Sequence, residues 1–377
     1  MAVGRPRRIL IVDDSAVMRS LLRSVVSSDA ALEVAGTAAD GESALKSIDT
    51  LHPDLILLDV EMPVMDGLVT LKQLRARGHK MPVVMCSSLT QRGARVTIEA
   101  LAGGASDYVT KPTGQSSREE ANRAIARDLL PKIHALTVQS AVPAVMIYPS
   151  WSGRPPRMLS PLSNRSNFAS SPVSVVAIGV STGGPAALDV LLPALPANFP
   201  IPVVIVQHMP ELFTALLAER LNGRCPLQVR EAAEGDSVRP GTIYLARGNW
   251  HLEAVPSSRS GQAATFHLNQ GPLENHCRPA VDALFRSVSA VYGAGVLAVV
   301  LTGMGSDGLA GCRIVRDHGG SVLAQDEASS TIWGMPGAVA RAGLAQDILP
   351  LGAIAPAILR LANRTFSQQN DLLRSAV

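Results

Sequence analysis

The sequence has few cysteines, few aromatic residues and little net charge, and each shortage excludes a class of protein. Its four cysteines form no CxxC pair and no Cys/His cluster with zinc spacing, so neither a disulfide framework nor a zinc finger is expected. Aromatic residues make up only 3% of the chain, too few for the stacking surfaces of single-strand binding proteins. The net charge of +3 is too small to indicate a nucleic-acid binding protein. No apolar run approaches the roughly 20 residues that a membrane helix requires. We therefore expect a protein of the reducing cytoplasm, with no nucleic-acid partner and no membrane insertion.

What is present is a globular composition in a chain long enough for two domains. Hydrophobic residues make up 47% of the 377 residues and charged residues 17%. Residues 1–135 alternate amphipathic stretches with the apolar runs ILIV, LEVAGTA, DLILLDV, PVVMCSS and DYVTK. Five βα units of this kind predict a flavodoxin-like (βα)5 domain, in which helices cover both faces of a parallel sheet.

The second half of the chain predicts another α/β domain after a break. Residues 136–172 are rich in Pro, Ser, Asn and Gly without periodicity, which indicates an interdomain linker. Residues 173–365 contain the strand candidates VSVVAIG, PVVIVQ and VLAVVL and predict a doubly wound, mostly parallel sheet. Alternating polarity across residues 226–255 predicts an edge hairpin region. Residues 366–377 are expected to form a polar tail.

Five polar residues follow or end four predicted strands of the first domain. Asp13 and Asp14 follow the first strand, Asp59 ends the third, Ser87 the fourth and Lys111 the fifth. Because the carboxyl ends of parallel strands meet in one crevice, we expect these side chains to lie close together. Three carboxylates there favour Mg²⁺, and the set suits phosphorylation of an aspartate. Taken singly, the aspartates have the plainer interpretation of helix caps and turn residues.

In these motifs the first domain resembles the receiver domain of two-component response regulators. The residues VDDS, LLDVEMPVMDG, CSS and DYVTKP carry the resemblance. It implies that Asp59 is the phosphoacceptor, that Asp13 and Asp14 bind Mg²⁺ with it, and that a histidine kinase is the phosphodonor. It also implies that Tyr108 is the aromatic switch residue, which rotates when Ser87 engages the phosphoryl group, while Lys111 neutralises the phosphoryl charge.

The stretch VVAIGVSTGGPAAL, residues 175–188, allows two interpretations. G-x-S-x-G is typical of a nucleophile elbow that exposes Ser181, whereas a glycine-rich turn between strand and helix also binds dinucleotides. A dinucleotide site needs an acidic residue at the end of the next strand. That strand ends instead in Gln207 and His208, with no Asp or Glu between Asp189 and Glu211, which disfavours a cofactor.

Three residues at predicted strand ends form a possible catalytic triad. Ser181, His208 and Asp307 each follow a strand of the same parallel sheet, which would bring a nucleophile, a base and an orienting acid together. The backbone N–H of Thr182 is a natural oxyanion donor because it follows the nucleophile. Individually, His208 has the alternative of a structural histidine and Asp307 that of a helix cap.

The second domain resembles the catalytic domain of chemotaxis protein-glutamate methylesterases. GVSTGG, VVIVQHMP, RPAVDALF, LTGMGSDG and AQDEASS followed by GMPGAVA carry the likeness. It implies hydrolysis of glutamate methyl esters on chemoreceptors by Ser181, His208 and Asp307, with release of methanol and no cofactor for this chemistry. It also implies deamidation of receptor glutamines and a second oxyanion donor at the N–H of Met304.

Two other functions stay open on the residues alone. One is a serine amidase or esterase that acts on another substrate, and the other is a non-catalytic, phosphorylation-gated binding module. The fusion of a phosphorylation site to a hydrolase site suggests the hypothesis that the first domain covers the triad until Asp59 is phosphorylated.

Overall fold

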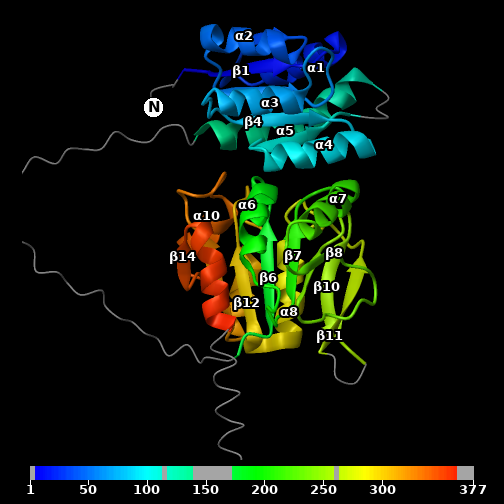
Figure 1. The fold of residues 1–377 in the computed structure, drawn as a ribbon, viewed down its shortest axis with the longest axis vertical. Helices are drawn as coiled ribbons and strands as arrows, with labels where there is room; N and C mark the ends of the chain where they lie inside the picture. Colours follow the sequence, from blue (N-terminus) through cyan, green and yellow to red (C-terminus); the bar gives the residue numbers. More distant parts are fainter. Residues whose placement is uncertain (1–4, 113–116, 139–171, 259–262, 363–377) are drawn as a thin grey trace, which may run out of the picture.

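The chain folds into two α/β domains that lie end to end (Figure 1). A computed structural model describes residues 5–112, 117–138, 172–258 and 263–362. Most of the predicted linker (139–171) and the whole predicted tail (366–377) lie outside the described residues. Within the described ranges no helix has both the length and the apolarity needed to cross a bilayer.

The N-terminal domain is a five-stranded parallel sheet in the order β2-β1-β3-β4-β5. This is the flavodoxin-like order, and the predicted apolar runs form its strands because both faces of the sheet are buried. Helix α5 extends to Val138, three residues into the segment predicted to be linker. The elements are β1 (Arg7–Val12), α1 (Ala16–Ser27), β2 (Leu32–Ala38), α2 (Gly41–Leu51), β3 (Leu55–Asp59), α3 (Gly67–Ala76), β4 (Val83–Ser87), α4 (Gln91–Ala102), β5 (Asp107–Thr110) and α5 (Arg118–Val138).

The first four helices of this domain begin at polar N-cap residues. The side chains of Ser15, Asp40, Asp66 and Thr90 each accept a hydrogen bond from a backbone N–H three residues further on. Each cap satisfies a backbone donor that the first helical turn leaves free, worth about 1 kcal/mol. The caps therefore fix where each helix starts after its strand, and they keep the loops at the carboxyl edge of the sheet short.

The C-terminal domain is built on a seven-stranded, fully parallel sheet in the order β14-β13-β12-β6-β7-β9-β8. The three strands predicted from sequence, β6, β7 and β12, lie side by side at its centre. The elements are β6 (Val175–Val180), α6 (Gly184–Leu191), η1 (Leu192–Ala194), β7 (Val203–Gln207), α7 (Glu211–Asn222), β8 (Gln228–Glu231), β9 (Thr242–Leu245), α8 (Val281–Tyr292), η2 (Gly293–Gly295), β12 (Val296–Val300), α9 (Leu309–Asp317), β13 (Ser321–Gln325), α10 (Met335–Arg341), β14 (Asp347–Leu349) and helical residues 351–362.

The region predicted to form edge hairpins, residues 226–255, contains two strands of the main sheet and most of the first strand of a hairpin whose second strand follows it. β10 (His251–Pro256) and β11 (Ala264–Asn269) pair antiparallel as a separate two-stranded sheet that packs on α8. The edge of the main sheet is extended by β9 and β8, which pair parallel. Alternating polarity indicates only that one face of a strand is exposed to solvent. It therefore could not distinguish an antiparallel hairpin from parallel strands at the sheet edge.

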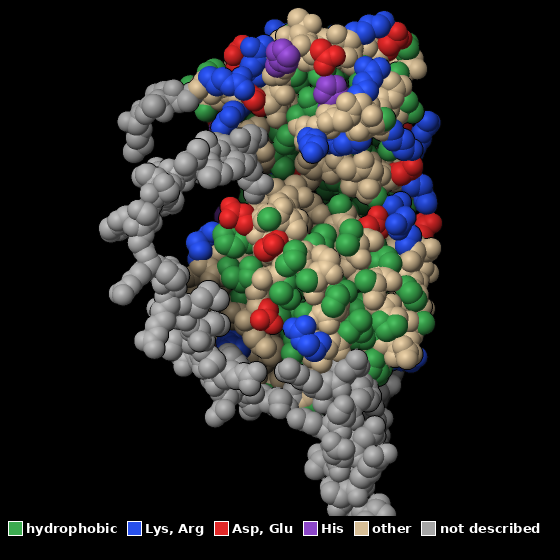
Figure 2. All heavy atoms as spheres, turned by 60° about the vertical axis from the view of Figure 1, so that its left-hand side comes forward, with side chains coloured by type: hydrophobic (Ala, Val, Ile, Leu, Met, Phe, Trp, Pro, Cys, Tyr) green, Lys and Arg blue, Asp and Glu red, His purple; other side chains and the backbone are tan. Residues whose placement is uncertain are grey.

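Two helical layers sandwich the C-terminal sheet, and one of them continues into the N-terminal domain. One layer consists of α6, α7 and residues 351–362, and the other of α8, α9, α10 and the hairpin. The apolar cluster under α6 and α7 is continuous with the core beneath α2, α3 and α4 of the N-terminal domain. Figure 1 shows α4 lying across the ends of α6 and α7. In Figure 2, hydrophobic side chains gather on the exposed face of the C-terminal domain, whereas Lys and Arg gather over the N-terminal domain.

Candidate active site and phosphorylation site

His208 and Asp307 form a close pair at the carboxyl edge of the C-terminal sheet. His208 directly follows β7, and its Nε2 lies 2.8 Å from Oδ2 of Asp307 in the loop after β12. Burial alone would lower the pKa of His208, but the Asp307 carboxylate and the Cys277 sulfur outweigh it and raise the pKa to about 9. The pairing leaves Nδ1 as the nitrogen that can accept a proton from a nucleophile.

Ser181 lies at the end of β6, between β7 and β12 in the sheet. Its backbone N–H donates to the Thr302 carbonyl (3.0 Å), so the turn is fixed to the loop after β12. Gly183 has φ +78°, a conformation that side chains rarely adopt, and a Cβ at Gly303 would lie 2.8 Å from Cβ of Ser181. The turn therefore has the tight backbone of a nucleophile elbow. Across the described residues, the Ser181 hydroxyl makes no hydrogen bond.

The Asp307 carboxylate is held by a network that the sequence did not reveal. Its Oδ2 accepts from the backbone of Val281 (2.7 Å), and its Oδ1 accepts from the backbone of Asp282 (3.0 Å) and from the side-chain amide of Asn275 (2.9 Å). The same amide nitrogen donates to the Asp282 carboxylate (2.9 Å). Burial, followed by the charge of Asp307, raises the pKa of Asp282. Asn275 therefore bridges two buried acids and fixes the orientation of the one that contacts His208.

The backbone N–H groups of Thr182 and Met304 are the predicted oxyanion donors. Thr182 directly follows Ser181. Met304 directly follows Gly303, the glycine at which an added Cβ would lie 2.8 Å from Cβ of Ser181. In the described parts of the chain neither N–H group has an acceptor. Two N–H donors without an acceptor, next to the partly exposed Ser181, would suit a tetrahedral oxyanion.

Both of these predicted oxyanion residues contact the N-terminal domain. The Thr182 hydroxyl donates a buried hydrogen bond of 2.6 Å to Oδ2 of Asp107, the first residue of β5. The Met304 side chain packs with buried Ile332 against the apolar cluster formed by β1, β3, α1 and α5. The N-terminal domain thus covers the loops that carry the candidate oxyanion donors.

Two further contacts join the domains beside these loops. The ring of Tyr108 stacks on Phe213 of α7, with centroids 4.7 Å apart and planes at 13°. Arg95 of α4 makes a two-pronged ion pair with Glu219 of α7, with nitrogen–oxygen distances of 3.1 and 3.2 Å. Tyr108, the predicted switch residue, is therefore buried in the domain junction.

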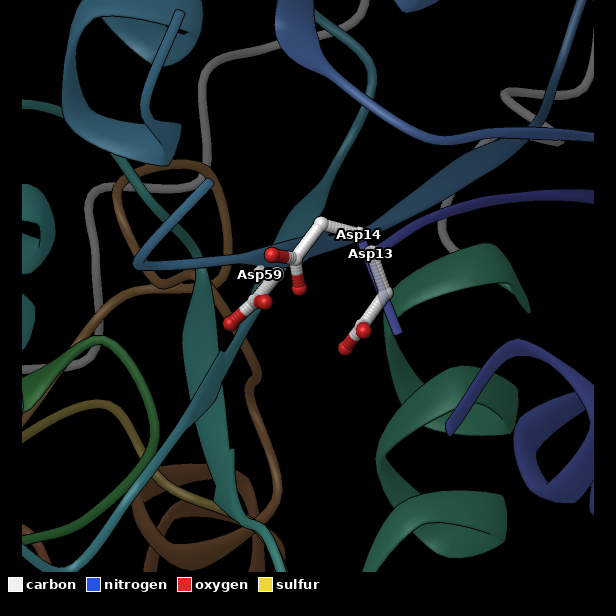
Figure 3. Close-up of side chains that lie close together, drawn as sticks. All are labelled: Asp13, Asp14 and Asp59. Atoms are coloured by element: carbon white, nitrogen blue, oxygen red, sulfur yellow. The ribbon is translucent and has the colours of Figure 1, made fainter. Parts of the chain in front are cut away.

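The five predicted residues of the N-terminal crevice also come together, and Figure 3 shows the three aspartates among them. Carboxylate oxygens of Asp13, Asp14 and Asp59 lie within 4.8 Å of one another, a donor set that suits a hard divalent cation. Lys111 Nζ lies 2.8 Å from Asp13 and 2.7 Å from Asp59. Burial, together with the charge of Asp13, raises the pKa of Asp59 to about 6, although Lys111 acts in the opposite direction. Ser87 is buried nearby and accepts from the Thr97 hydroxyl (2.7 Å).

Sequence reasoning missed the residues that support the triad. Asn275 and Cys277 lie in the turn before α8, far from the glycine motifs, and Asp282 lies in the first turn of α8. The Cys277 Sγ lies 3.6 Å from Nδ1 of His208. The only signal was that RPAVDALF, which contains Asp282, belongs to the stretches that carry the family resemblance.

Comparisons with known proteins divide the chain in the same way. The family described as response regulator receiver domain matches residues 9–122, and that described as CheB methylesterase matches residues 176–358. A protein-glutamate methylesterase/protein-glutamine glutaminase of Trichodesmium erythraeum is 48% identical over 360 residues, covering 94% of this chain and 98% of that protein. One from a Nocardioides species is 46% identical over 353 residues, covering 94% of each. Among solved structures, the CheB methylesterase catalytic domain of Thermotoga maritima is 41% identical, covers 51% of this chain and all of that chain, and has a TM-score of 0.49.

Proposed function

This chain belongs to the family of protein-glutamate methylesterases/protein-glutamine glutaminases with a receiver domain, and on that premise we propose that it hydrolyses glutamate methyl esters on chemoreceptors through Ser181. The observation that carries the proposal is the 2.8 Å contact between His208 and Asp307, beside the strand end that presents Ser181.

The proposed reaction uses these three side chains. The Ser181 Oγ attacks the ester carbonyl carbon while Nδ1 of His208 takes the hydroxyl proton, and the carbonyl oxygen becomes an oxyanion between the N–H groups of Thr182 and Met304. The protonated His208 then gives its proton to the departing methoxide, and methanol leaves. Water, deprotonated by His208, attacks the acyl-enzyme and releases the free glutamate. Asp307 keeps the imidazole oriented and stabilises its charge.

The same route hydrolyses a glutamine side chain, because ammonia can take the place of methanol as the leaving group. The acyl-enzyme is then identical, and only the protonation of a poorer leaving group differs. We therefore include deamidation of receptor glutamines in the proposed function, with no cofactor for either reaction.

Regulation is proposed to run through the crevice of the receiver domain, with a histidine kinase as phosphodonor. Asp13, Asp14 and Asp59 would hold Mg²⁺, which supplies positive charge to the phosphoryl group when it is bound. Asp59 would accept the phosphoryl group, Lys111 would pair with its oxygens and Ser87 would donate to it. The contacts of Asp107, Tyr108 and Met304 support closure of the active site in the unphosphorylated state.

The experiment is methanol release from receptor membranes that carry methylated glutamates, with and without a phosphodonor. We expect slow release that the phosphodonor accelerates, and no measurable release by Ser181→Ala, since loss of a triad nucleophile typically costs about 10⁶-fold. Ser181→Ala should still bind the membranes. Release from a small ester but not from receptors would support an esterase of other specificity, and binding without any turnover would support the binding module.

A further inference from the structure

Cys277 is a thiol at the active site that the proposed mechanism does not use. Its Sγ lies 3.6 Å from Nδ1 of His208, the nitrogen that must accept the Ser181 proton. Its backbone exchanges two hydrogen bonds with Glu274, of 2.8 and 3.1 Å, around a turn in which Asn275 and His276 both have positive φ. The backbone of Cys277 is therefore fixed by a hydrogen-bonded turn, which holds the thiol beside His208.

The thiol is the end of a line of three interacting groups. Cys277 contacts Nδ1 of His208, and Nε2 of the same ring contacts Asp307. Serine and cysteine hydrolases activate their nucleophile in this way: the nucleophile contacts a base, and a third group orients that base. The pair of His208 and Asp307 thus contacts the thiol of Cys277, while Ser181 follows the neighbouring strand end.

The surroundings of this cysteine differ from those of the other three. Cys86 and Cys312 are buried, and burial raises the pKa of both thiols well above the usual range. Burial, together with the charge of Asp189, raises the pKa of Cys225 to about 11. Cys277 is partly exposed, and its Sγ contacts an imidazole whose own pKa is raised to about 9, against burial, chiefly by Asp307, which favours the protonated ring. A neighbouring imidazolium stabilises a thiolate, which is the reactive form.

We propose that Cys277 is an activated thiol whose covalent modification switches off the esterase. The proposal rests on the proposed function, because it uses the role of His208 there. A group added to Sγ occupies the space beside Nδ1 and keeps the imidazole from the Ser181 hydroxyl. The ligand class is a small electrophile or a peroxide.

The chemistry is balanced for both reagents. With iodoacetamide, the thiolate sulfur forms a bond to carbon, the carbon–iodine bond breaks and iodide leaves. With hydrogen peroxide, sulfur bonds to one oxygen and the O–O bond breaks. The sulfur is oxidised to a sulfenic acid and the peroxide is reduced. Its second oxygen leaves as hydroxide, which takes up a proton to become water. A dithiol reductant returns the sulfenic acid to the thiol, whereas the alkylated thiol is permanent.

The test compares the full-length protein with Cys277→Ala, with Cys225→Ser as the matched control. Each is treated with iodoacetamide or peroxide near neutral pH, and methylesterase activity is expressed relative to the same variant untreated. We expect the wild type and Cys225→Ser to lose most activity and Cys277→Ala to retain it, with recovery by dithiothreitol after peroxide only. Equal losses in wild type and Cys277→Ala would overturn the proposal.

A second measurement follows modification itself and needs no esterase activity. Mass spectrometry gives the alkylation rate of Cys277 in wild type, in Ser181→Ala and in His208→Asn. We expect the same rate in Ser181→Ala and a fall of about tenfold or more in His208→Asn, because the thiol loses its cationic partner. An unchanged rate in His208→Asn would overturn the activation of the thiol. Absence of esterase activity with fast, His208-dependent alkylation would instead count against the proposed function alone.

Discussion

Tyr108 of the receiver domain stacks on Phe213 of the catalytic domain at 4.7 Å, with the two rings nearly parallel. Tyr108 lies on the strand that leads to Lys111, and Phe213 lies on the helix that follows His208. The ring contact therefore connects the strand end of the proposed phosphorylation site to the strand end that carries the proposed base.

Tyr108→Ala should raise the basal methylesterase activity. Aromatic pairs contribute about 0.5–1.5 kcal/mol beyond their buried area, so we expect a rise of roughly two- to tenfold in the unphosphorylated protein. Tyr108→Phe keeps the ring and should stay near the wild-type basal rate. Methanol release without a phosphodonor measures the effect, and a basal rate unchanged in Tyr108→Ala would show that the stack does not hold the closed state.

Asp107→Ala removes the acceptor for the Thr182 hydroxyl and should also raise basal activity. A hydrogen bond to a charged group is worth about 1.5–3 kcal/mol, which corresponds to about tenfold or more. Asp107 also pairs with Lys132 (3.9 Å). The matched control is Asp128→Ala, because Asp128 pairs with Lys132 as well (2.9 Å) and lies on the receiver side. Activation by both variants alike would assign the effect to Lys132 rather than to the bond with Thr182.

Asn275→Gly should lower kcat by roughly tenfold to a hundredfold, since Asp307 loses a hydrogen bond that orients it. Glycine suits the positive φ at this position (50°), so the change removes the amide without adding backbone strain. Steady-state kinetics and thermal unfolding are measured together. A loss of kcat no greater than the loss of folded protein would assign Asn275 a structural role only.

The pH dependence of kcat/KM should report His208. The base works only when neutral, and its pKa is raised to about 9, so kcat/KM of the unphosphorylated protein should rise with pH up to that value. Cys277→Ala removes one of the groups that raise this pKa, after Asp307, and should move the rise to lower pH. A wild-type profile that is flat from about pH 7 to pH 9 would contradict the assignment.

Removal of divalent metal should abolish stimulation by a phosphodonor and leave basal methylesterase activity intact, because Asp13, Asp14 and Asp59 lie in the receiver domain. Asp14→Asn should reproduce this result, since it removes one of the three clustered carboxylates. Glu61→Gln is the control, because Glu61 lies beside the crevice but outside the cluster and pairs with Arg92. Full stimulation of Asp14→Asn would remove Asp14 from the metal site.

The sequence predicted the fold and the strand-end residues because both depend on local patterns. Buried parallel strands appear as apolar runs, and a polar residue directly after such a run must lie at the carboxyl edge of the sheet. The prediction that the chain belongs to the methylesterase family with a receiver domain is confirmed. The catalytic roles of Ser181, His208 and Asp307 stay predictions that rest on geometry.

Contacts made by residues far apart in the sequence could not be predicted in the same way. Asn275 reaches Asp307 only because its turn folds back against the sheet edge, and nothing in the sequence around it indicates that distance. The bond between Asp107 and Thr182 depends on how one domain docks on the other. Likewise, β8 and β9 join the sheet in parallel although their alternating polarity is equally compatible with a hairpin.

Asp107 and Tyr108 are consecutive residues of β5, yet one is hydrogen-bonded to Thr182, next to Ser181, and the other is stacked on Phe213. Neighbouring residues on a strand point in opposite directions, so this short strand contacts the catalytic domain on both of its sides. It cannot withdraw from one contact while keeping the other. If phosphorylation opens this junction, we therefore expect cooperative opening, so that a half-phosphorylated population is a mixture of fully inhibited and fully active molecules rather than a set of molecules of intermediate rate.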